Sequence, residues 1–223
     1  MRSIKLRGRL RPWQLALATA IIAALAIPAM AIGRADKVKT TTFPLFVNGA
    51  NLNCLKAPGQ TPAVTATVKR GKTNDTMTLN LSGFKPKLAF DLFTVQHSSQ
   101  LANGQPDPAF VASKSFGMAW YQSDIQTSSD GTAKVTIKTI LLDQIFGFDA
   151  DTGLAPTNTF HVGFWFNDPA DAAACGFTGF TPFNGEHHAG PLAFITRPNA
   201  TTKLGPLCTD PESAGGGTFV CNP

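Results

Sequence analysis

Hydrophobic and polar residues alternate along several short segments, which is the pattern of strands with one buried and one exposed face. Residues 64–69 (VTATVK) and 76–82 (TMTLNLS) both alternate in this way. Residues 70–75 between them combine Gly, Asn and Asp, which predicts a hairpin connection. Each of the two strands should place one face on a core and the other toward water.

A second hairpin is predicted where residues 116–126 and 133–139 flank the sequence SSDG at 128–131. Asp-Gly supplies the positive φ angles that tight hairpin turns need. Residues 160–166 (FHVGFWF) are apolar at both sets of alternating positions. That pattern predicts a central strand covered on both faces, or one that lines the core and an outer contact.

Helix signals are sparse. Asp168 as N-cap, Pro169 as first residue and Gly176 as stop predict one short helix, and residues 140–146 predict a single turn. Short strands with few helices and long loops predict an all-β fold, an antiparallel β-sandwich of immunoglobulin-like or jelly-roll-like type. We expect a single domain over residues 43–223, preceded by a flexible arm at 32–42.

The first 31 residues have the three parts of a secretory signal peptide. A basic stretch comes first, an apolar run from Leu15 to Ile27 follows, and Ala29-Met30-Ala31 supplies small residues for cleavage after Ala31. A membrane-spanning helix needs about 20 apolar residues, so we expect no membrane span after cleavage. The alternative is an uncleaved N-terminal anchor. The leader predicts a secreted or extracytoplasmic protein.

Charge changes once the leader is removed. The whole chain has 19 Lys and Arg against 14 Asp and Glu, a net charge of +5. Five of the cations and none of the acids lie in residues 1–31, so the mature chain is formally neutral. A basic balance would have indicated nucleic acid or an anionic membrane as partner. We therefore expect no nucleic-acid partner, and an extracellular ligand or protein of unknown identity instead.

Four cysteines occur after the leader: Cys54, Cys175, Cys208 and Cys221. In an exported chain an even number predicts disulfides. Cys208 and Cys221 enclose a short Gly-rich segment, and closing it would remove roughly 3 kcal/mol of denatured-state entropy. We therefore favour Cys208–Cys221 and, by elimination, Cys54–Cys175. A zinc site built from cysteine is the alternative, although the chain has no CxxC pair.

The histidines are the candidate metal ligands. Glu186, His187 and His188 lie in one polar segment, and His161 or His97 could complete a zinc or copper site with them. Adjacent residues of an extended segment point to opposite faces, so only one of the His187–His188 pair would face a given site. The competing interpretation is an ordinary polar loop with no cofactor, which we favour.

Two other features predict ligand sites. Asp149 and Asp151 before a glycine resemble the first half of a calcium loop, but the downstream glutamate of such a loop is missing. Trp120, Tyr121 and Trp165 are the residue types that stack on sugar rings when they are exposed. Because the chain has 17 Phe residues, we favour the alternative that these aromatic residues belong to the core. The chain has no GxSxG motif, and its mature part has only two glutamates, so no catalytic residue is assigned and a non-catalytic protein is favoured.

Two segments resemble sequences of uncharacterised secreted bacterial proteins. The first is FHVGFWFNDP at 160–169 with AAAC at 172–175, and the second is PFNGEHHAG at 182–190. The resemblance implies a bacterial exported protein and implies no activity. The sequence thus predicts a secreted, disulfide-bonded β module that binds a ligand or partner or belongs to the cell envelope, with a metal-binding protein or metalloenzyme as the alternative.

Overall fold

A computed structural model gives the fold. It describes residues 40–49, 52–69, 74–111, 115–117, 119–139, 159–177 and 190–208, all within the unit Lys37–Pro223. The predicted leader, most of the predicted arm and the predicted turn at 140–146 lie outside these residues. In the described part, no helix has the length and apolar character needed to cross a membrane.

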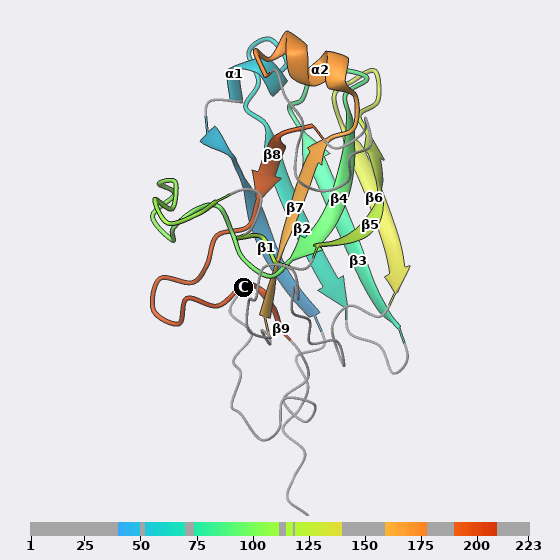
Figure 1. Cartoon of the computed structure of the whole chain (residues 1–223). Helices are drawn as coiled ribbons and strands as arrows, with labels where there is room; N and C mark the ends of the chain where they lie inside the picture. Colours follow the sequence, from blue (N-terminus) through green and yellow to red (C-terminus); the bar gives the residue numbers. More distant parts are fainter. Residues whose placement is uncertain are drawn as a thin grey trace, which may run out of the picture. The chain divides into compact units, whose positions relative to one another are not determined.

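The described residues form nine strands and two short helices, and every strand pairing is antiparallel (Figure 1). The strands are β1 (Thr40–Val47), β2 (Ala63–Lys69), β3 (Asp75–Ser82), β4 (Ala89–Val95), β5 (Ala119–Gln126), β6 (Ala133–Thr139), β7 (Thr159–Phe166), β8 (Leu192–Ile195) and β9 (Leu207–Cys208). The helices are α1 (Leu52–Leu55) and α2 (Pro169–Ala174). The expectation of an all-β fold is confirmed.

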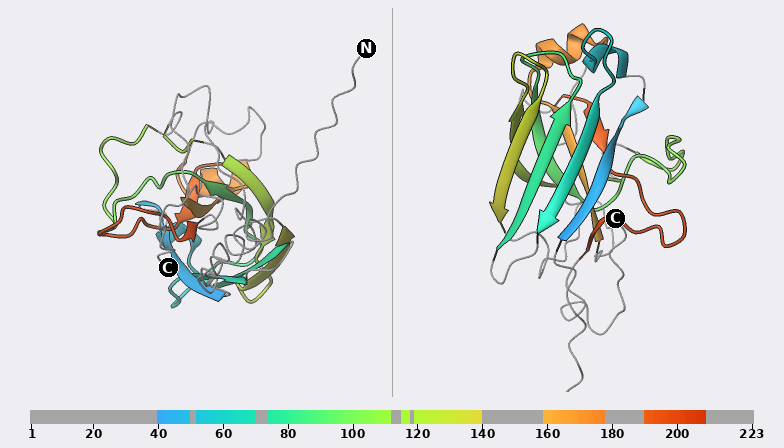
Figure 2. Two further views of the ribbon diagram at one scale, coloured as in Figure 1. Left: turned by 90° about the horizontal axis from the view of Figure 1, so that it is seen from below. Right: turned by 180° about the vertical axis from the view of Figure 1, so that it is seen from behind.

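One sheet runs in the order β5-β4-β7-β8-β1-β2-β3-β6, and β9 pairs with β7 (Figure 1). Strand β1 joins its two halves, because residues 40–45 pair with β2 whereas Phe46 and Val47 pair with β8. The sheet curls until its end strands β5 and β6 come side by side, which leaves a nearly closed, barrel-like sheet (Figure 2).

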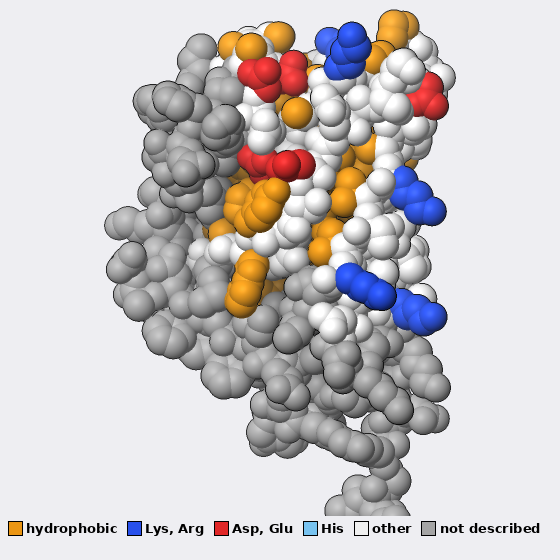
Figure 3. Space-filling view, turned by 90° about the vertical axis from the view of Figure 1, so that its right-hand side faces the viewer, with side chains coloured by type: hydrophobic (Ala, Val, Ile, Leu, Met, Phe, Trp, Pro, Cys, Tyr) orange, Lys and Arg blue, Asp and Glu red, His pale blue; other side chains and the backbone are white. Residues whose placement is uncertain are grey.

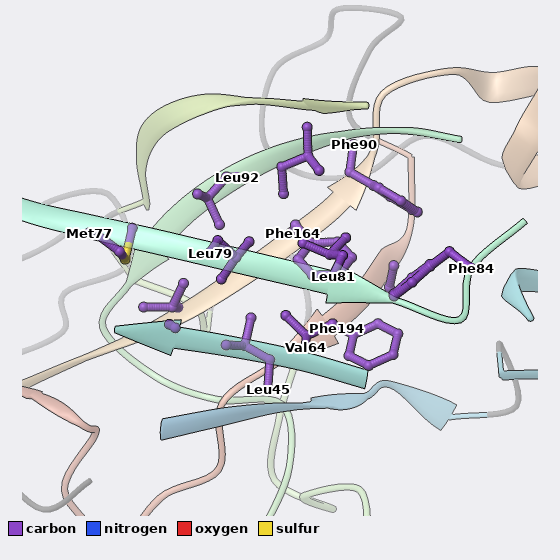
Figure 4. Close-up of a cluster of buried hydrophobic side chains, with 14 of the residues drawn as sticks. Leu45, Val64, Met77, Leu79, Leu81, Phe84, Phe90, Leu92, Phe164 and Phe194 are labelled. Carbon is purple, nitrogen blue, oxygen red and sulfur yellow. The ribbon is translucent and has the colours of Figure 1, made fainter. Parts of the chain in front are cut away.

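The main core fills the space that the curled sheet encloses (Figure 4). Val64, Leu79 and Leu81 point into it from β2 and β3, as the alternation predicts. Aromatic rings come from the opposite half: those of Phe164 and Phe194 stack with centroids 5.2 Å apart. Full burial of each such side chain stabilises the fold by roughly 1.5–3 kcal/mol, so this core is the main source of stability.

The two predicted hairpins have different outcomes. Strands β2 and β3 pair from Ala63↔Ser82 to Lys69↔Thr76, so the first hairpin is confirmed. The second is wrong: β5 pairs with β4 and β6 pairs with β3, on opposite halves of the sheet. The Asp130-Gly131 turn does form, and at one end of the barrel it carries the chain from β5 to β6, which lie side by side without pairing. The amide of Phe84 donates to the Gly131 carbonyl at 3.2 Å, which joins this crossing to the one between β3 and β4.

The predicted arm also needs a correction. Strand β1 begins at Thr40, and Thr40, Thr41 and Thr42 pair with Lys69, Val68 and Thr67. The side chain of Thr42 lies 3.0 Å from the hydroxyl of Thr67. These threonines were assigned to the arm because the segment is polar, but β-branched side chains suit the exposed face of a strand.

One end of the barrel is covered by the two helices (Figure 1). Asp168 caps α2, since its carboxylate accepts from the amide of Ala170 at 2.7 Å, and Gly176 follows the helix with a φ of 84°. The helix prediction is thus confirmed. A disulfide joins Cys54 in α1 to Cys175 just after α2, which is the pairing expected by elimination. Cys221 lies outside the described residues, so Cys208–Cys221 stays a prediction.

Candidate functional site

A second, smaller apolar cluster lies outside the barrel, on the outer face of β4, β7 and β8. We call it the outer cluster: buried Val95, Phe116, Trp165, Leu192 and Ile195, with Phe93, Phe110 and Ala119 packed against them. The long loop at 96–117, described except for 112–114, folds back over the sheet to cover these residues. This explains why every residue from Phe160 to Phe166 is buried, and it confirms a strand covered on both faces.

Above the outer cluster the loop leaves a cavity of about 550 Å³, which we call the Arg197 cavity. Its apolar lining includes Phe110, Phe116, Trp165 and Leu192. Its polar lining includes Asn48, Ser99, Gln100, Asp107 and Arg197. An apolar floor with a few placed polar groups, in a space of this size, is typical of small-molecule sites.

Gln100 holds the loop to the sheet. Its side chain is 4% exposed, and its amide nitrogen donates to the carbonyl of Val47 at 2.7 Å. Because a carbonyl only accepts, this contact fixes which end of the Gln100 amide carries the oxygen. That oxygen accepts from Nε of Arg197 at 2.8 Å. The end of β1, the loop and the segment after β8 are therefore connected through one buried amide.

Arg197 follows β8 and lies between two surfaces. Its Cζ atom is 3.9 Å from the centre of the Phe46 ring. On another side is Gly104, where a Cβ atom would come within 2.5 Å of the guanidinium. Burial lowers the pKa of Arg197, although a guanidinium stays charged at any ordinary pH. The cation is therefore partly desolvated and held in one orientation.

A neighbouring cavity of about 370 Å³, which we call the histidine cavity, is bordered by both His97 and His161. His161 is 3% exposed, and its Nδ1 lies 3.1 Å from the carbonyl of Thr196. The same nitrogen lies 3.0 Å from the hydroxyl of Thr196, so one ring nitrogen faces both oxygens of this residue. Burial lowers the pKa of His161 to about 3, so the ring is neutral at physiological pH. Burial also lowers the pKa of His97.

The predicted metal set is only partly visible. His97 and His161 share a cavity, but Glu186, His187 and His188 lie outside the described residues. Within the described ranges, no three His, Cys, Asp or Glu side chains are grouped as metal ligands would be. Asp149 and Asp151 of the predicted calcium loop also lie outside the described residues. Both metal hypotheses therefore stay predictions.

The predicted stacking residues do not form one surface. Trp165 is 1% exposed and packs against Phe93 and Phe116, so it is a core residue, the alternative favoured for these aromatic residues, and it cannot stack on a sugar. The doubly apolar run at 160–166 indicated this burial, although it could not show that the loop at 96–117 provides the cover. Trp120 and Tyr121 of β5 are both exposed. Hydrophobic and acidic side chains lie near one another on the face of the molecule that is at the right in Figure 1 (Figure 3).

Trp120 and Tyr121 are neighbours in β5, so their side chains leave opposite faces of the strand. The hydroxyl of Tyr121 donates to Asp124 at 2.8 Å. Burial, followed by the hydrogen bond and charge of Asp124, raises the pKa of Tyr121 to about 12. Tyr121 is therefore engaged with a carboxylate, and a two-ring platform for a sugar is not formed.

Comparison with known protein families, with curated proteins and with solved structures finds no match for this chain. The function must therefore be argued from the fold and the cavities. Sequence reasoning missed Arg197, Gln100 and Asp107, because each is a single polar residue in a loop with no motif around it. The one available signal was the length of the loop between β4 and β5, since long loops in compact domains are commonly functional.

Proposed function

We propose that the mature chain is an extracytoplasmic, non-catalytic binding module that takes a small ligand in the Arg197 cavity. The observation that carries this proposal is the cavity itself, an apolar floor built by the outer cluster beneath a rim of fixed polar groups. A disulfide fits an oxidising destination. The main core is sufficient to stabilise the fold, so the outer cluster is not needed for stability. A role in ligand binding explains why the loop at 96–117 covers the outer face of the sheet with apolar residues.

In this proposal the fold is a β-sandwich whose two layers share β1. The strand neighbours support it: β4 pairs with β5, β5 lies beside β6, and β6 pairs with β3, which is the strand order of a Greek key. Both immunoglobulin-like and jelly-roll-like sandwiches contain such keys. The main core lies between the two halves, as in a sandwich.

Filling the mouth of the cavity tests the proposal. Pro106 is exposed and lines the cavity, whereas Pro108 is exposed in the same loop and lines none of the cavities described above. We expect phenylacetate and phenylacetamide to bind the oxidised protein by calorimetry and to shift the indole N–H resonance of Trp165. Pro106→Trp should weaken both compounds at least about tenfold, close to 1.4 kcal/mol.

Pro108→Trp is the matched control, because it adds the same bulk to the same loop away from the cavity. It should bind both compounds as the unmodified protein does. Equal binding by Pro106→Trp and the unmodified protein, or no binding of either compound to any form, would contradict the proposed function.

A further inference from the structure

We propose that the Arg197 cavity selects small monocarboxylates with an apolar body, and that Arg197 binds the carboxylate. The inference rests on the proposed function and names its ligand class. It depends on the orientation of Arg197, on the hydrogen-bond donors that Arg197 has left, and on the charge of the cavity lining.

Arg197 is organised before any ligand arrives. Nε is occupied by Gln100, the ring of Phe46 lies against the guanidinium, and Gly104 comes close on another side. Gly104 has a φ of 85°, a conformation that suits glycine, and any side chain there would meet the guanidinium. The side chain therefore has little freedom to lose when it binds an anion, which favours affinity.

The two Nη groups of Arg197 carry four further N–H donors. No described carboxylate forms an ion pair with them, and Nε is the one atom of this guanidinium hydrogen-bonded to a described residue. A partly desolvated cation with a planar fork of donors suits a carboxylate, which accepts two parallel hydrogen bonds from such a fork.

The rest of the lining limits the ligand to one negative charge and an apolar body. Asp107 lines the same cavity and adds one negative charge to its lining. One oxygen of Asp107 already accepts from the amide of Ala109 at 2.9 Å, which holds the carboxylate in place. A second anionic group on the ligand would meet this carboxylate. The apolar floor of Phe110, Phe116 and Trp165 offers contact to an aromatic or alkyl body instead.

Three probes separate charge from shape: phenylacetate, its uncharged analogue phenylacetamide, and acetate, which has the charge without the body. We expect the oxidised protein to bind phenylacetate at least about tenfold more tightly than phenylacetamide, and to bind acetate weakest, as expected for a charge-assisted hydrogen-bonded pair on an apolar floor. Calorimetry measures the three dissociation constants.

Arg197→Gln should bind phenylacetate and phenylacetamide equally, because the acid loses more affinity than the amide does. Residual amide binding shows that the cavity is still present, so a loss of preference is a loss of charge recognition. Lys134→Gln is the matched control, because Lys134 is an exposed cation on β6, away from the cavity. It should keep the preference of the unmodified protein. Arg197→Lys should give an intermediate preference, since lysine keeps the charge and loses the fork.

The inference is overturned if the unmodified protein binds the acid and the amide equally, or if Arg197→Gln keeps the preference for the acid. In both cases the amide still binds, so the proposed function survives. If none of the three probes binds, the proposed function fails together with the inference.

Discussion

His161 is buried among apolar side chains, yet its ring makes polar contacts. It lies near the start of β7, between the core residues Phe160 and Val162, and it contacts both the carbonyl and the hydroxyl of Thr196, at 3.1 and 3.0 Å. The hydroxyl of Thr196 in turn accepts from the amide of Val162 at 3.1 Å. The histidine thus helps to join β7 to the end of β8 while it stays neutral.

Burial of this neutral histidine makes stability depend on pH. The pKa of His161 falls from its ordinary 6.5 to about 3 in the folded protein. Below pH 6.5 the unfolded chain binds a proton that the folded chain does not, so the free energy of unfolding falls as pH decreases toward 3. Well above pH 6.5 the ring is neutral in both the folded and the unfolded chain, so His161 no longer makes the free energy of unfolding depend on pH.

Lowering the pH from 6.5 to 4.5 should reduce the free energy of unfolding of both proteins. We expect the reduction to be about 2 kcal/mol smaller for His161→Asn than for the unmodified protein, since one pKa unit corresponds to 1.36 kcal/mol. Urea unfolding at the two pH values measures the difference. The effect of carboxylate titration on stability is the same in both proteins, so it drops out of the comparison. His97→Asn is the control: burial lowers the pKa of His97 too, but part of its ring reaches solvent, so it should change the pH dependence much less. The same loss in His161→Asn as in the unmodified protein would show that His161 does not titrate with a lowered pKa.

Among the elements, those with local signals were predicted and those with distant partners were not. Strands β2, β3 and β7 and helix α2 follow from alternation, a doubly apolar run and capping residues. Pairing of β5 with β6 was wrong because an Asp-Gly turn fixes the path of the chain and leaves the neighbours of each strand open. The cavities could not be predicted, since they depend on where a long loop lies on β7.

The Asp130-Gly131 crossing has a glycine that its surroundings require. Gly131 has a φ of 76°, and a Cβ atom there would collide with the carbonyl oxygen of Phe84. Gly59 has a similar φ of 71° but open space around it. Substituting Gly59 therefore measures the cost of the backbone conformation alone, whereas substituting Gly131 adds the cost of the collision.

We expect Gly59→Ala to lower the free energy of unfolding by about 1 kcal/mol, the cost of a left-handed alanine. Gly131→Ala should lower it by about 3 kcal/mol or more, because the two crossings must also move apart. Urea unfolding monitored by circular dichroism gives both values. Equal losses in the two variants would mean that the contact with Phe84 is unimportant.

For the whole molecule, the disulfide is the one covalent connection between distant segments that the described residues contain. It joins residues 121 positions apart and fastens α1 to α2 over one end of the barrel. The sequence predicted this pairing only by elimination, after the closely spaced Cys208 and Cys221 had been paired with each other. Spacing along the chain cannot show that Cys54 and Cys175 meet at the same end of a barrel.

Replacing both cysteines, as Cys54→Ser with Cys175→Ser, should lower the free energy of unfolding by about 4 kcal/mol, since the bond closes a loop of more than a hundred residues. Urea unfolding without reductant measures this loss. Replacing Cys208 and Cys221 instead tests the predicted second disulfide, which closes a much shorter loop and should contribute less. A Cys54–Cys175 replacement as stable as the unmodified protein would contradict the stabilising role of this bond.

The position of β1 between β2 and β8 has a consequence for how the chain folds. Phe46 and Val47 find their partners Ile195 and Phe194 about 150 residues later, so the sheet stays incomplete until almost all of the chain is present. Folds dominated by such distant pairings have high contact order and fold slowly. If the protein is exported as we propose, slow folding would keep the polypeptide unfolded while it crosses a membrane, and the barrel would close only afterwards.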